Sequence, residues 1–256
     1  MNVLKPSQLR SLGMPAQIKP LYLFDNDQGI KQHPSYLEAK AGSTSHAIEL
    51  IGDLALETIY KHRDRFGRDC VFVAPHAKEA TGDNAIPQVL AEVSSLVCGA
   101  IADQEIVQTT KVYHTGADPM ERLISRPEFQ GRVDQGRSYV LVDDVTSLGG
   151  TLAELAHYIQ THGGKVEDVF ILVNAGRNKS LQPEQRTLKL LEARFGHDIV
   201  KTFGIAVGAL TANEAQYLVG FRSVDEIRNR VAKARQEIDL RLRSKGVRLD
   251  PSAQIG

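Results

Sequence analysis

Two short runs in this chain are apolar at consecutive positions, residues 140–142 in SYVLVDD and residues 169–173 in DVFILVN. A strand with one face in water alternates apolar and polar residues, whereas a strand that is apolar throughout is buried on both faces. Segments with helical periodicity flank both runs. The sequence therefore predicts an α/β fold of Rossmann-like type, with a central, mostly parallel sheet flanked by helices.

The remaining pattern adds strands and helices around these two runs. We expect further strands at 70–75, 105–110 and 199–207. Helices are expected where apolar residues recur at intervals of three and four, at 48–59, 86–97 and 152–159. Pro87 fits the first turn of the second of these helices, where its missing N–H would have no partner in any case.

The predicted core spans residues 44–207, and both ends of the chain are accessory to it. Residues 1–43 are expected to contribute to a hood or a sheet edge, and residues 208–256 to form a C-terminal helical appendage. The appendage opens with a capping-box pattern from Ser223 to Glu226. Its apolar stripe consists of Ile227, Val231, Ala234, Ile238 and Leu242. Such a stripe needs a partner surface, either on the domain itself or on a second subunit.

The composition narrows the range of functions. Lys and Arg together number 31, as do Asp and Glu, so no net charge attracts nucleic acid or an acidic membrane. The absence of Trp also argues against single-strand binding by base stacking. No apolar run is long enough to span a membrane, and the N-terminal residues lack the apolar core of a signal peptide. Cys70 and Cys98 lie in apolar runs and are expected to be reduced, buried thiols of a cytoplasmic protein.

The segment YVLVDDVTSLGGTLAEL, residues 139–155, joins a buried strand to a predicted helix. Ligands of parallel sheets bind beyond the carboxyl ends of the strands. There Gly149 and Gly150 would let a phosphate approach the free N–H groups at the start of the helix. Asp143 and Asp144 would repel a phosphate, so they must face sugar hydroxyls or a divalent cation. A ribose 5-phosphate that carries a pyrophosphate satisfies both requirements.

The string VLVDDVTSLGGT resembles the phosphoribosyl-pyrophosphate (PRPP) loop of the type I phosphoribosyltransferases. In that pattern a hydrophobic strand precedes two acids, an aliphatic residue, a free position, Thr or Ser, and then Gly and Thr two residues apart. The flanking strings FQGRVDQGRSY and GGKVEDVFILV are similar to the family's flanks, and the resemblance covers residues 70–175. The family fold that it implies is the same parallel α/β sheet, with a hood from the chain ends.

The resemblance also implies roles for the residues of this loop. Asp143 and Asp144 would hold the ribose 2′- and 3′-hydroxyls and, directly or indirectly, a Mg²⁺ cofactor. The implied PRPP-binding set consists of Asp143, Asp144, Val145, Thr146, Ser147, Leu148, Gly149, Gly150 and Thr151. The plainer alternative is an Asp pair that solvates a loop, followed by a Gly-Gly turn without a ligand.

Two further loops are expected to handle the pyrophosphate. The loop at 74–87 takes the place of the family's pyrophosphate loop but lacks its usual Arg-Gly-Gly-like sequence; the candidates in it are His76, Lys78, Thr81 and Gly82. Residues 111–136 have the place and length of a lid that excludes water. The basic candidates in the lid are Lys111, His114, Arg122 and Arg126. Lys78 and Arg122 join the acid pair as the expected catalytic residues, although Lys78 is equally consistent with plain surface.

The acceptor of the ribosyl group is expected to be selected by the hood. Phe203 and Tyr217, with Phe221, are candidates for stacking on a planar base. Core packing is the commoner fate of such aromatic residues.

These observations favour a Mg²⁺-dependent phosphoribosyltransferase that transfers ribose 5-phosphate from PRPP to a nucleobase-like heterocycle, in purine or pyrimidine salvage, as a cytoplasmic homodimer. One alternative is a non-catalytic protein of the same fold that senses PRPP or a nucleotide; the unusual 74–87 loop and the C-terminal stripe favour it. Another is an accessory effector that modifies or hydrolyses nucleotides.

Overall fold

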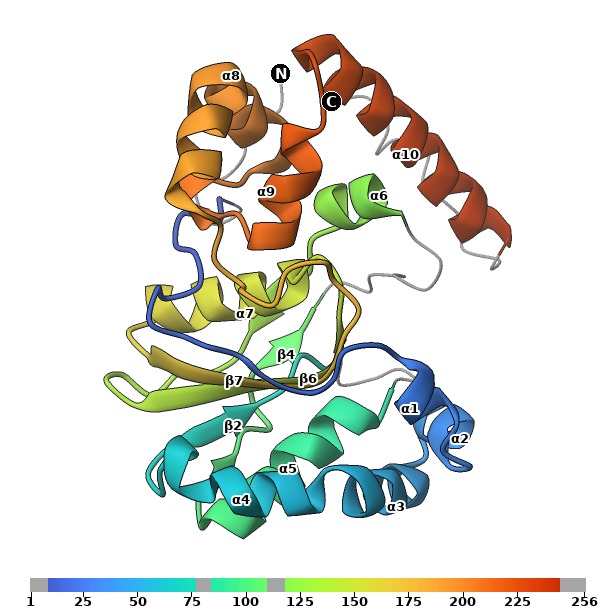
Figure 1. Ribbon diagram of the computed structural model, residues 1–256, viewed down its shortest axis with the longest axis vertical. Coiled ribbons are helices and arrows are strands. Elements are labelled where there is room, and N and C mark those ends of the chain that lie inside the picture. Colours follow the sequence, from blue (N-terminus) through green and yellow to red (C-terminus); the bar gives the residue numbers. More distant parts are fainter. Residues whose placement is uncertain (1–8, 77–83, 110–117, 245–256) are drawn as a thin grey trace.

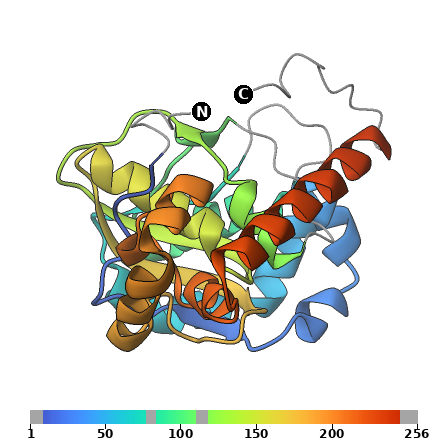
Figure 2. The same ribbon diagram turned by 90° about the horizontal axis from the view of Figure 1, so that it is seen from above.

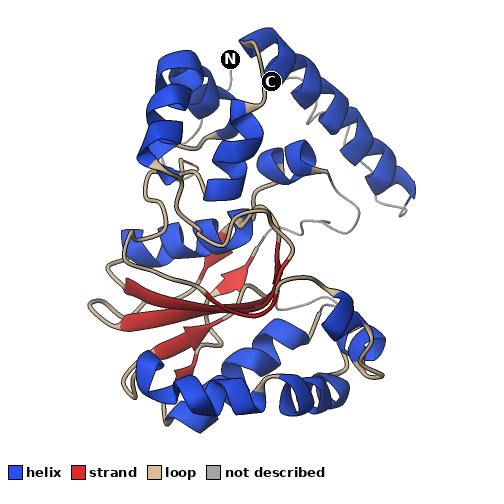
Figure 3. Ribbon diagram, in the orientation of Figure 1, coloured by secondary structure: helices blue, strands red, loops and turns tan. Residues whose placement is uncertain are grey.

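The computed structural model describes residues 9–76, 84–109 and 118–244, with side chains as far as residue 240. Its centre is a five-stranded sheet in the order β1-β7-β6-β2-β3. These strands are β1 (Leu21–Phe24), β2 (Val71–Val73), β3 (Ile101–Ala102), β6 (Ser138–Thr146) and β7 (Lys165–Asn174). Every neighbouring pair in this sheet is parallel, and helices lie on both sides of it (Figure 3). The predicted α/β fold class is therefore confirmed.

Different helices cover the two faces of the sheet (Figure 1). On one face α3 (Thr44–Leu54), α4 (Leu56–Phe66) and α5 (Ile86–Cys98) share an apolar cluster with Val140 and Phe170 of the sheet. On the other face α7 (Gly150–Thr161) packs its apolar side against Leu141 and Ile171. The two longest strands thus bury both of their faces, as their continuous apolar runs predict.

A third layer lies beyond α7 and is called the helical cap. It consists of α6 (Pro119–Ile124), α8 (Gln185–Phe203), α9 (Ala212–Val219) and α10 (Val224–Ser244), which share an apolar cluster of their own (Figure 1). Ile227, Val231 and Ala234 of α10 are buried in this cluster, and Figure 2 shows α10 running past α6. The first half of the predicted stripe therefore packs on the chain's own domain, and Ile238, further along the stripe, is half-buried.

Three predicted elements differ in the structure. Residues 199–207 are not a strand: α8 continues to Phe203, and Gly204 ends it with a left-handed φ of 63°. The reason is a spacing of four residues between buried apolar side chains, which continues from earlier in the helix at Leu191, Phe195, Ile199 and Phe203. The strand expected at 105–110 is reduced to β4 (Val107–Gln108), which pairs with β5 (Phe129–Gln130) in a separate antiparallel sheet. The helix expected at 48–59 is divided at Ala55 into α3 and α4.

The N-terminal segment runs along both the sheet and the helical cap. Its strand β1 forms one edge of the sheet beside β7, and Arg10 forms a parallel bridge with Ile205 after α8. Two short helices, α1 (Gln28–Lys31) and α2 (Tyr36–Lys40), follow β1, and a 3₁₀ turn, η2 (Val207–Ala209), precedes α9. The domain boundaries at residues 43 and 207 stay a prediction. Among the described helices, none has the length and apolarity needed to cross a membrane.

Candidate functional site

The acid pair and the Gly-Gly loop lie at the carboxyl end of β6. Asp143 and Asp144 belong to the strand itself, which continues to Thr146 beside Asn174 at the end of β7. Gly149 then adopts a left-handed φ of 80° and caps α7, which begins at Gly150. Residues with a Cβ rarely adopt this conformation, so the glycine allows the chain to leave a buried strand and enter a helix within three residues.

The carbonyl groups of this loop are held by the rest of the protein. The backbone N–H of Ala175 donates to the Thr146 carbonyl over 2.8 Å, and the Asn213 side-chain amide donates to the Ser147 carbonyl over 2.9 Å. The Thr211 hydroxyl donates to the Leu148 carbonyl. The N–H groups of residues 147–151, by contrast, have no protein acceptor among the described hydrogen bonds. The loop is therefore anchored through its carbonyl groups, and its N–H groups are left without an acceptor in the described part of the chain.

Asp144 is buried and its carboxylate is already engaged by three donors. The Lys40 ammonium lies 2.6 Å from Oδ2, and the Asn84 side-chain amide donates to the same oxygen over 2.8 Å. The backbone N–H of Val145 donates to Oδ1 over 2.8 Å. Burial opposes the charge on Lys40, but the attraction of Asp144 outweighs it and raises the pKa of Lys40.

Asp143 differs from Asp144 in its surroundings. It is half-buried, and its Oδ1 accepts the backbone N–H of Asp144 over 2.9 Å. Burial, and then the neighbouring charge of Asp144, raise the pKa of Asp143 well above its usual range. The two carboxylates that the sequence treats as equivalent therefore have separate environments: Asp144 is fixed by protein donors, and Asp143 lies against it with a weakened tendency to ionise.

The predicted basic residues have different fates. Arg122 on α6 donates from Nη1 to the Ser147 hydroxyl over 2.9 Å, so it does reach the loop. Arg126 does not, because it forms an ion pair with Glu154 at 2.6 Å and donates to the carbonyls of Phe203 and Gly204. Its expected role in the lid is therefore replaced by a structural one. His76 is half-buried after β2, with Nδ1 3.2 Å from the Ala74 carbonyl oxygen.

Several other candidates lie outside the described residues. They are Lys78, Thr81, Gly82, Lys111 and His114. Their roles stay predictions.

The aromatic candidates lie in the helical cap. Phe203 is 4% exposed within the cap's apolar cluster, so core packing is the alternative that holds for it, and its expected stacking role is wrong. Tyr217 is half-buried and meets Phe221 edge to face, with ring centroids 5.3 Å apart. Burial raises the pKa of Tyr217. Stacking of Tyr217 on a base stays a prediction.

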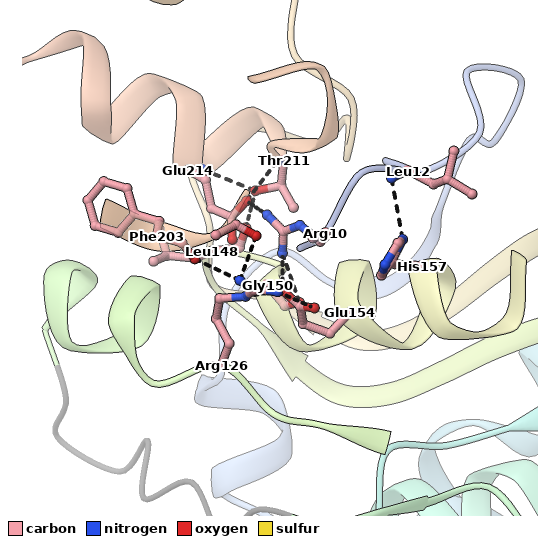
Figure 4. A network of polar contacts seen from close by, with 11 residues as sticks. Arg10, Leu12, Arg126, Leu148, Gly150, Glu154, His157, Phe203, Thr211 and Glu214 are labelled. Carbon is pink, nitrogen blue, oxygen red and sulfur yellow. Dashed lines mark hydrogen bonds and ion pairs between the residues drawn. The ribbon is translucent and has the colours of Figure 1, made fainter. Parts of the chain in front are cut away.

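The loop is joined to the helical cap by a buried charged network (Figure 4). Arg10 is fully buried and pairs with Glu154 of α7 and Glu214 of α9. Glu154 also pairs with Arg126, and Glu214 accepts the backbone N–H of Thr211 over 2.8 Å. Two arginines thus balance two glutamates in an interior where an unpaired charge would be costly. The network fixes the start of α7 relative to α9.

Sequence reasoning missed four residues that shape the site: Lys40, Asn84, Asn213 and Arg10. Asn213 has the most connections, because its Oδ1 accepts the N–H groups of Arg177 and Asn178 while its amide reaches Ser147. A Cβ on Gly176 would lie 2.3 Å from this amide nitrogen, so glycine is needed there. The one sequence pattern that marked this region was the string TANE around Asn213. In it Thr211 and Glu214 form the capping box that opens α9.

The fold and this junction define an α/β protein with a parallel sheet and a Gly-Gly loop between β6 and α7. Among curated proteins, the chain is 34% identical to Protein TraN of Escherichia coli over 225 residues, which is 85% of this chain and 50% of that protein. It is 39% identical over 129 residues to a Haemophilus influenzae protein described as uncharacterized, which is 50% of this chain and 29% of that protein. The chain thus spans half the length or less of the curated relatives it matches.

No family model matches the chain. Similar solved structures include adenine phosphoribosyltransferase from Thermoanaerobacter pseudethanolicus, with 15% identity and a TM-score of 0.33 over 51% of this chain and 73% of that chain. Hypoxanthine phosphoribosyltransferase from Staphylococcus aureus gives 12% identity and a TM-score of 0.31 over 56% and 71%. At these values the likeness supports no inference about activity.

Proposed function

We propose that this chain is a phosphoribosyltransferase that transfers ribose 5-phosphate from PRPP to a nucleobase-like heterocycle and releases pyrophosphate. The setting that we propose is base salvage in the cytoplasm by a homodimer. The observation that carries the proposal is the β6–α7 junction. There the N–H groups of residues 147–151 have no acceptor within the described residues, and they follow the pair of Asp143 and Asp144 at the end of β6.

Each half of the junction suits one part of PRPP. The donors at the start of α7 and the hydroxyls of Thr146, Ser147 and Thr151 would bind the 5-phosphate. Arg122, which already contacts Ser147, adds positive charge at this end. The acid pair would accept hydrogen bonds from the ribose hydroxyls. It would anchor the sugar and not act as a general base.

The chemistry follows from the charge that develops in ribosyl transfer. The anomeric carbon gains positive character as pyrophosphate leaves, and the acceptor nitrogen attacks it. Groups that stabilise the departing pyrophosphate therefore lower the barrier. In this chain the candidates for that task are Lys78 and the lid residues Lys111 and His114.

In this proposal Mg²⁺ makes no direct contact with Asp144. Both oxygens of Asp144 accept protein hydrogen bonds, and the Lys40 ammonium lies against one of them. We therefore propose that Mg²⁺ enters with the pyrophosphate of the substrate and not on a protein carboxylate.

Calorimetry with PRPP tests the proposal. The protein should bind PRPP in the presence of Mg²⁺, and the double variant Asp143→Asn, Asp144→Asn should bind it at least ~100-fold more weakly, because each lost hydrogen bond to a charged group costs about 1.5–3 kcal/mol. The matched control is Asp198→Asn with Asp225→Asn, which removes the same charge from two partners of Arg228 in the helical cap. Equal PRPP binding by both double variants would defeat the proposal.

A second proposal is a non-catalytic sensor of PRPP or a nucleotide. The observation that favours it is the engagement of Asp144 by Lys40 and Asn84, which fixes the acid pair before any ligand arrives. Pyrophosphate release across a panel of purine and pyrimidine bases separates the two proposals. Tight PRPP binding without release on any base identifies the sensor.

A further inference from the structure

A lysine from the N-terminal segment lies on the acid pair. Lys40 is the last residue of α2, and its ammonium lies 2.6 Å from Asp144 Oδ2. The backbone fixes this approach, because the N–H of Ala85, one residue before α5, donates to the Ala39 carbonyl over 3.1 Å. The Lys40 side chain is 35% exposed, so it is not sealed inside the described part of the protein.

The partners of Asp144 oppose the binding of a second cation. Asn84 donates to the same oxygen as Lys40, and Val145 donates to the other. A Mg²⁺ ion binds carboxylate oxygen at about 2.0–2.1 Å and demands near-octahedral geometry. It would have to displace the ammonium or lie against it. The Lys40 ammonium therefore occupies the position beside Asp144 that a metal ion would take.

The Lys40 ammonium also changes which ligand groups can lie beside the acid pair. In the proposed function, Asp143 and Asp144 hold the ribose hydroxyls, and their charge of up to −2 would repel the pyrophosphate on the neighbouring anomeric carbon. One neighbouring lysine offsets half of that charge, and a lysine ammonium has three donors, of which one is directed at Asp144. The remaining donors suit phosphate oxygens.

We propose that Lys40 is the resident cation of the acid pair, that it excludes a protein-bound divalent ion, and that it binds the pyrophosphate end of the ligand. The exclusion of metal is argued from the ion pair of Lys40 with Asp144 and does not depend on the proposed function. The assignment of the ligand rests on the proposed function.

The first experiment uses Mn²⁺ alone, detected by the loss of the free-ion signal in electron paramagnetic resonance. The unaltered protein should show no Mn²⁺ site at the acid pair. Lys40→Met should gain one at least ~10-fold tighter than any background binding, and adding Asp144→Asn to that variant should remove it. Lys61→Met is the control, because Lys61 pairs with exposed Glu57 and lies far from the site in the sequence.

Two results of this experiment overturn the proposal. One is Mn²⁺ binding by the unaltered protein that disappears in Asp144→Asn, which would show that Lys40 does not hold the position. The other is a folded Lys40→Met variant that binds Mn²⁺ no better than Lys61→Met. If Lys40→Met does not fold, the titration of the unaltered protein decides the point, with Lys40→Arg expected to exclude Mn²⁺ as well.

The second experiment compares PRPP with ribose 5-phosphate, which lacks the pyrophosphate. Lys40→Met should weaken PRPP binding by ~10-fold or more, the usual effect of losing a hydrogen bond to a charged group, and should change ribose 5-phosphate binding far less. An equal loss for both ligands overturns the assignment of Lys40 to the pyrophosphate end. If the unaltered protein binds neither compound, the proposed function fails, while the Mn²⁺ titration still decides the exclusion of metal.

Discussion

Arg10 and Glu154 form an ion pair at 3.0 Å in which the arginine side chain is fully buried and the glutamate is 6% exposed. They lie 144 positions apart in the sequence, so the pair joins the N-terminal segment to the helix that begins at the candidate phosphate loop. Arg10 also donates to the Gly150 carbonyl in the first residue of α7. The position of the loop therefore depends on a charge at the far end of the chain.

Replacing Arg10 with Met should strongly destabilise the protein. It leaves Glu214 buried without its arginine and Glu154 with Arg126 alone. Removing one partner of a buried ion pair typically costs about 3–5 kcal/mol. Urea unfolding followed by circular dichroism measures the change. The control is Arg228→Met, whose side chain is 59% exposed and pairs with Asp198, and whose loss should cost less than ~1 kcal/mol. Similar costs for the two variants would contradict the role of the network.

Replacing Gly149 with Ala should strain the β6–α7 junction. Gly149 has a φ of 80°, and a Cβ there would meet its nearest neighbour, Leu181, at 3.4 Å. The space is sufficient, so the cost comes from the backbone conformation, about 1–2 kcal/mol for a residue other than glycine. The unfolding free energy should fall by that amount, and ribose 5-phosphate binding should weaken with it.

Gly52 provides the matched control for this substitution. It lies inside α3, and a Cβ there meets nothing within 4 Å. Gly52→Ala should therefore raise the unfolding free energy by about 0.5–1 kcal/mol, since alanine is the better helix former. A Gly149→Ala variant as stable as Gly52→Ala would show that the left-handed conformation is not required.

Replacing Asn213 with Ala should release the loop from the segment after β7. The substitution removes the hydrogen bond to the Ser147 carbonyl and those from the N–H groups of Arg177 and Asn178. Leaving such partners unsatisfied costs about 1–3 kcal/mol in unfolding free energy. Hydrogen exchange should also speed up at residues 176–178, where the N–H groups of Arg177 and Asn178 lose their acceptor. Asn229→Ala, on the exposed face of α10, is the control and should leave exchange at this segment unchanged. Unaltered exchange in Asn213→Ala would contradict the coupling.

The central layers of this fold follow from local sequence patterns. The runs at 140–142 and 169–173 predict two strands buried on both faces, and both occur within β6 and β7. The wrong strand at 199–207 shows where local reasoning fails. Read alone, Ile199 to Val207 is a mixed apolar run, whereas from Leu191 onward the same apolar residues repeat every four positions as a helix does.

The candidate site was predictable only along one continuous stretch of chain. Asp143 to Thr151 form a contiguous pattern, and the structure keeps them together at a strand end. Lys40, Asn84 and Asn213 reach that stretch from distant segments, and each is an ordinary polar residue in its own surroundings. Only the packing of the sheet brings them to it. Arg10 has no local signal either, because its partners lie on two different helices.

A histidine near the charged network, His157, should make the stability of the protein depend on pH. His157 lies on α7, and its Nδ1 accepts the backbone N–H of Leu12 over 3.3 Å (Figure 4). Burial lowers the pKa of His157, and the positive charges of Arg10 and Arg126 act in the same direction, against the opposing effect of Glu154. The neutral ring is thus the form that suits the folded protein.

Stability should therefore fall on the acidic side of neutrality, in part through His157. The ordinary pKa of histidine is about 6.5, and below it His157 takes up a proton in the unfolded chain but not in the folded protein. The free energy of unfolding therefore decreases as the pH falls, until the lowered pKa of folded His157 is reached. Urea unfolding at several pH values between neutrality and mild acid measures this slope. His157→Gln, which retains a hydrogen-bond acceptor, should have a shallower slope than the unaltered protein, whereas replacement of exposed His197 should leave the slope unchanged. A slope unaffected by His157→Gln would show that another group is responsible.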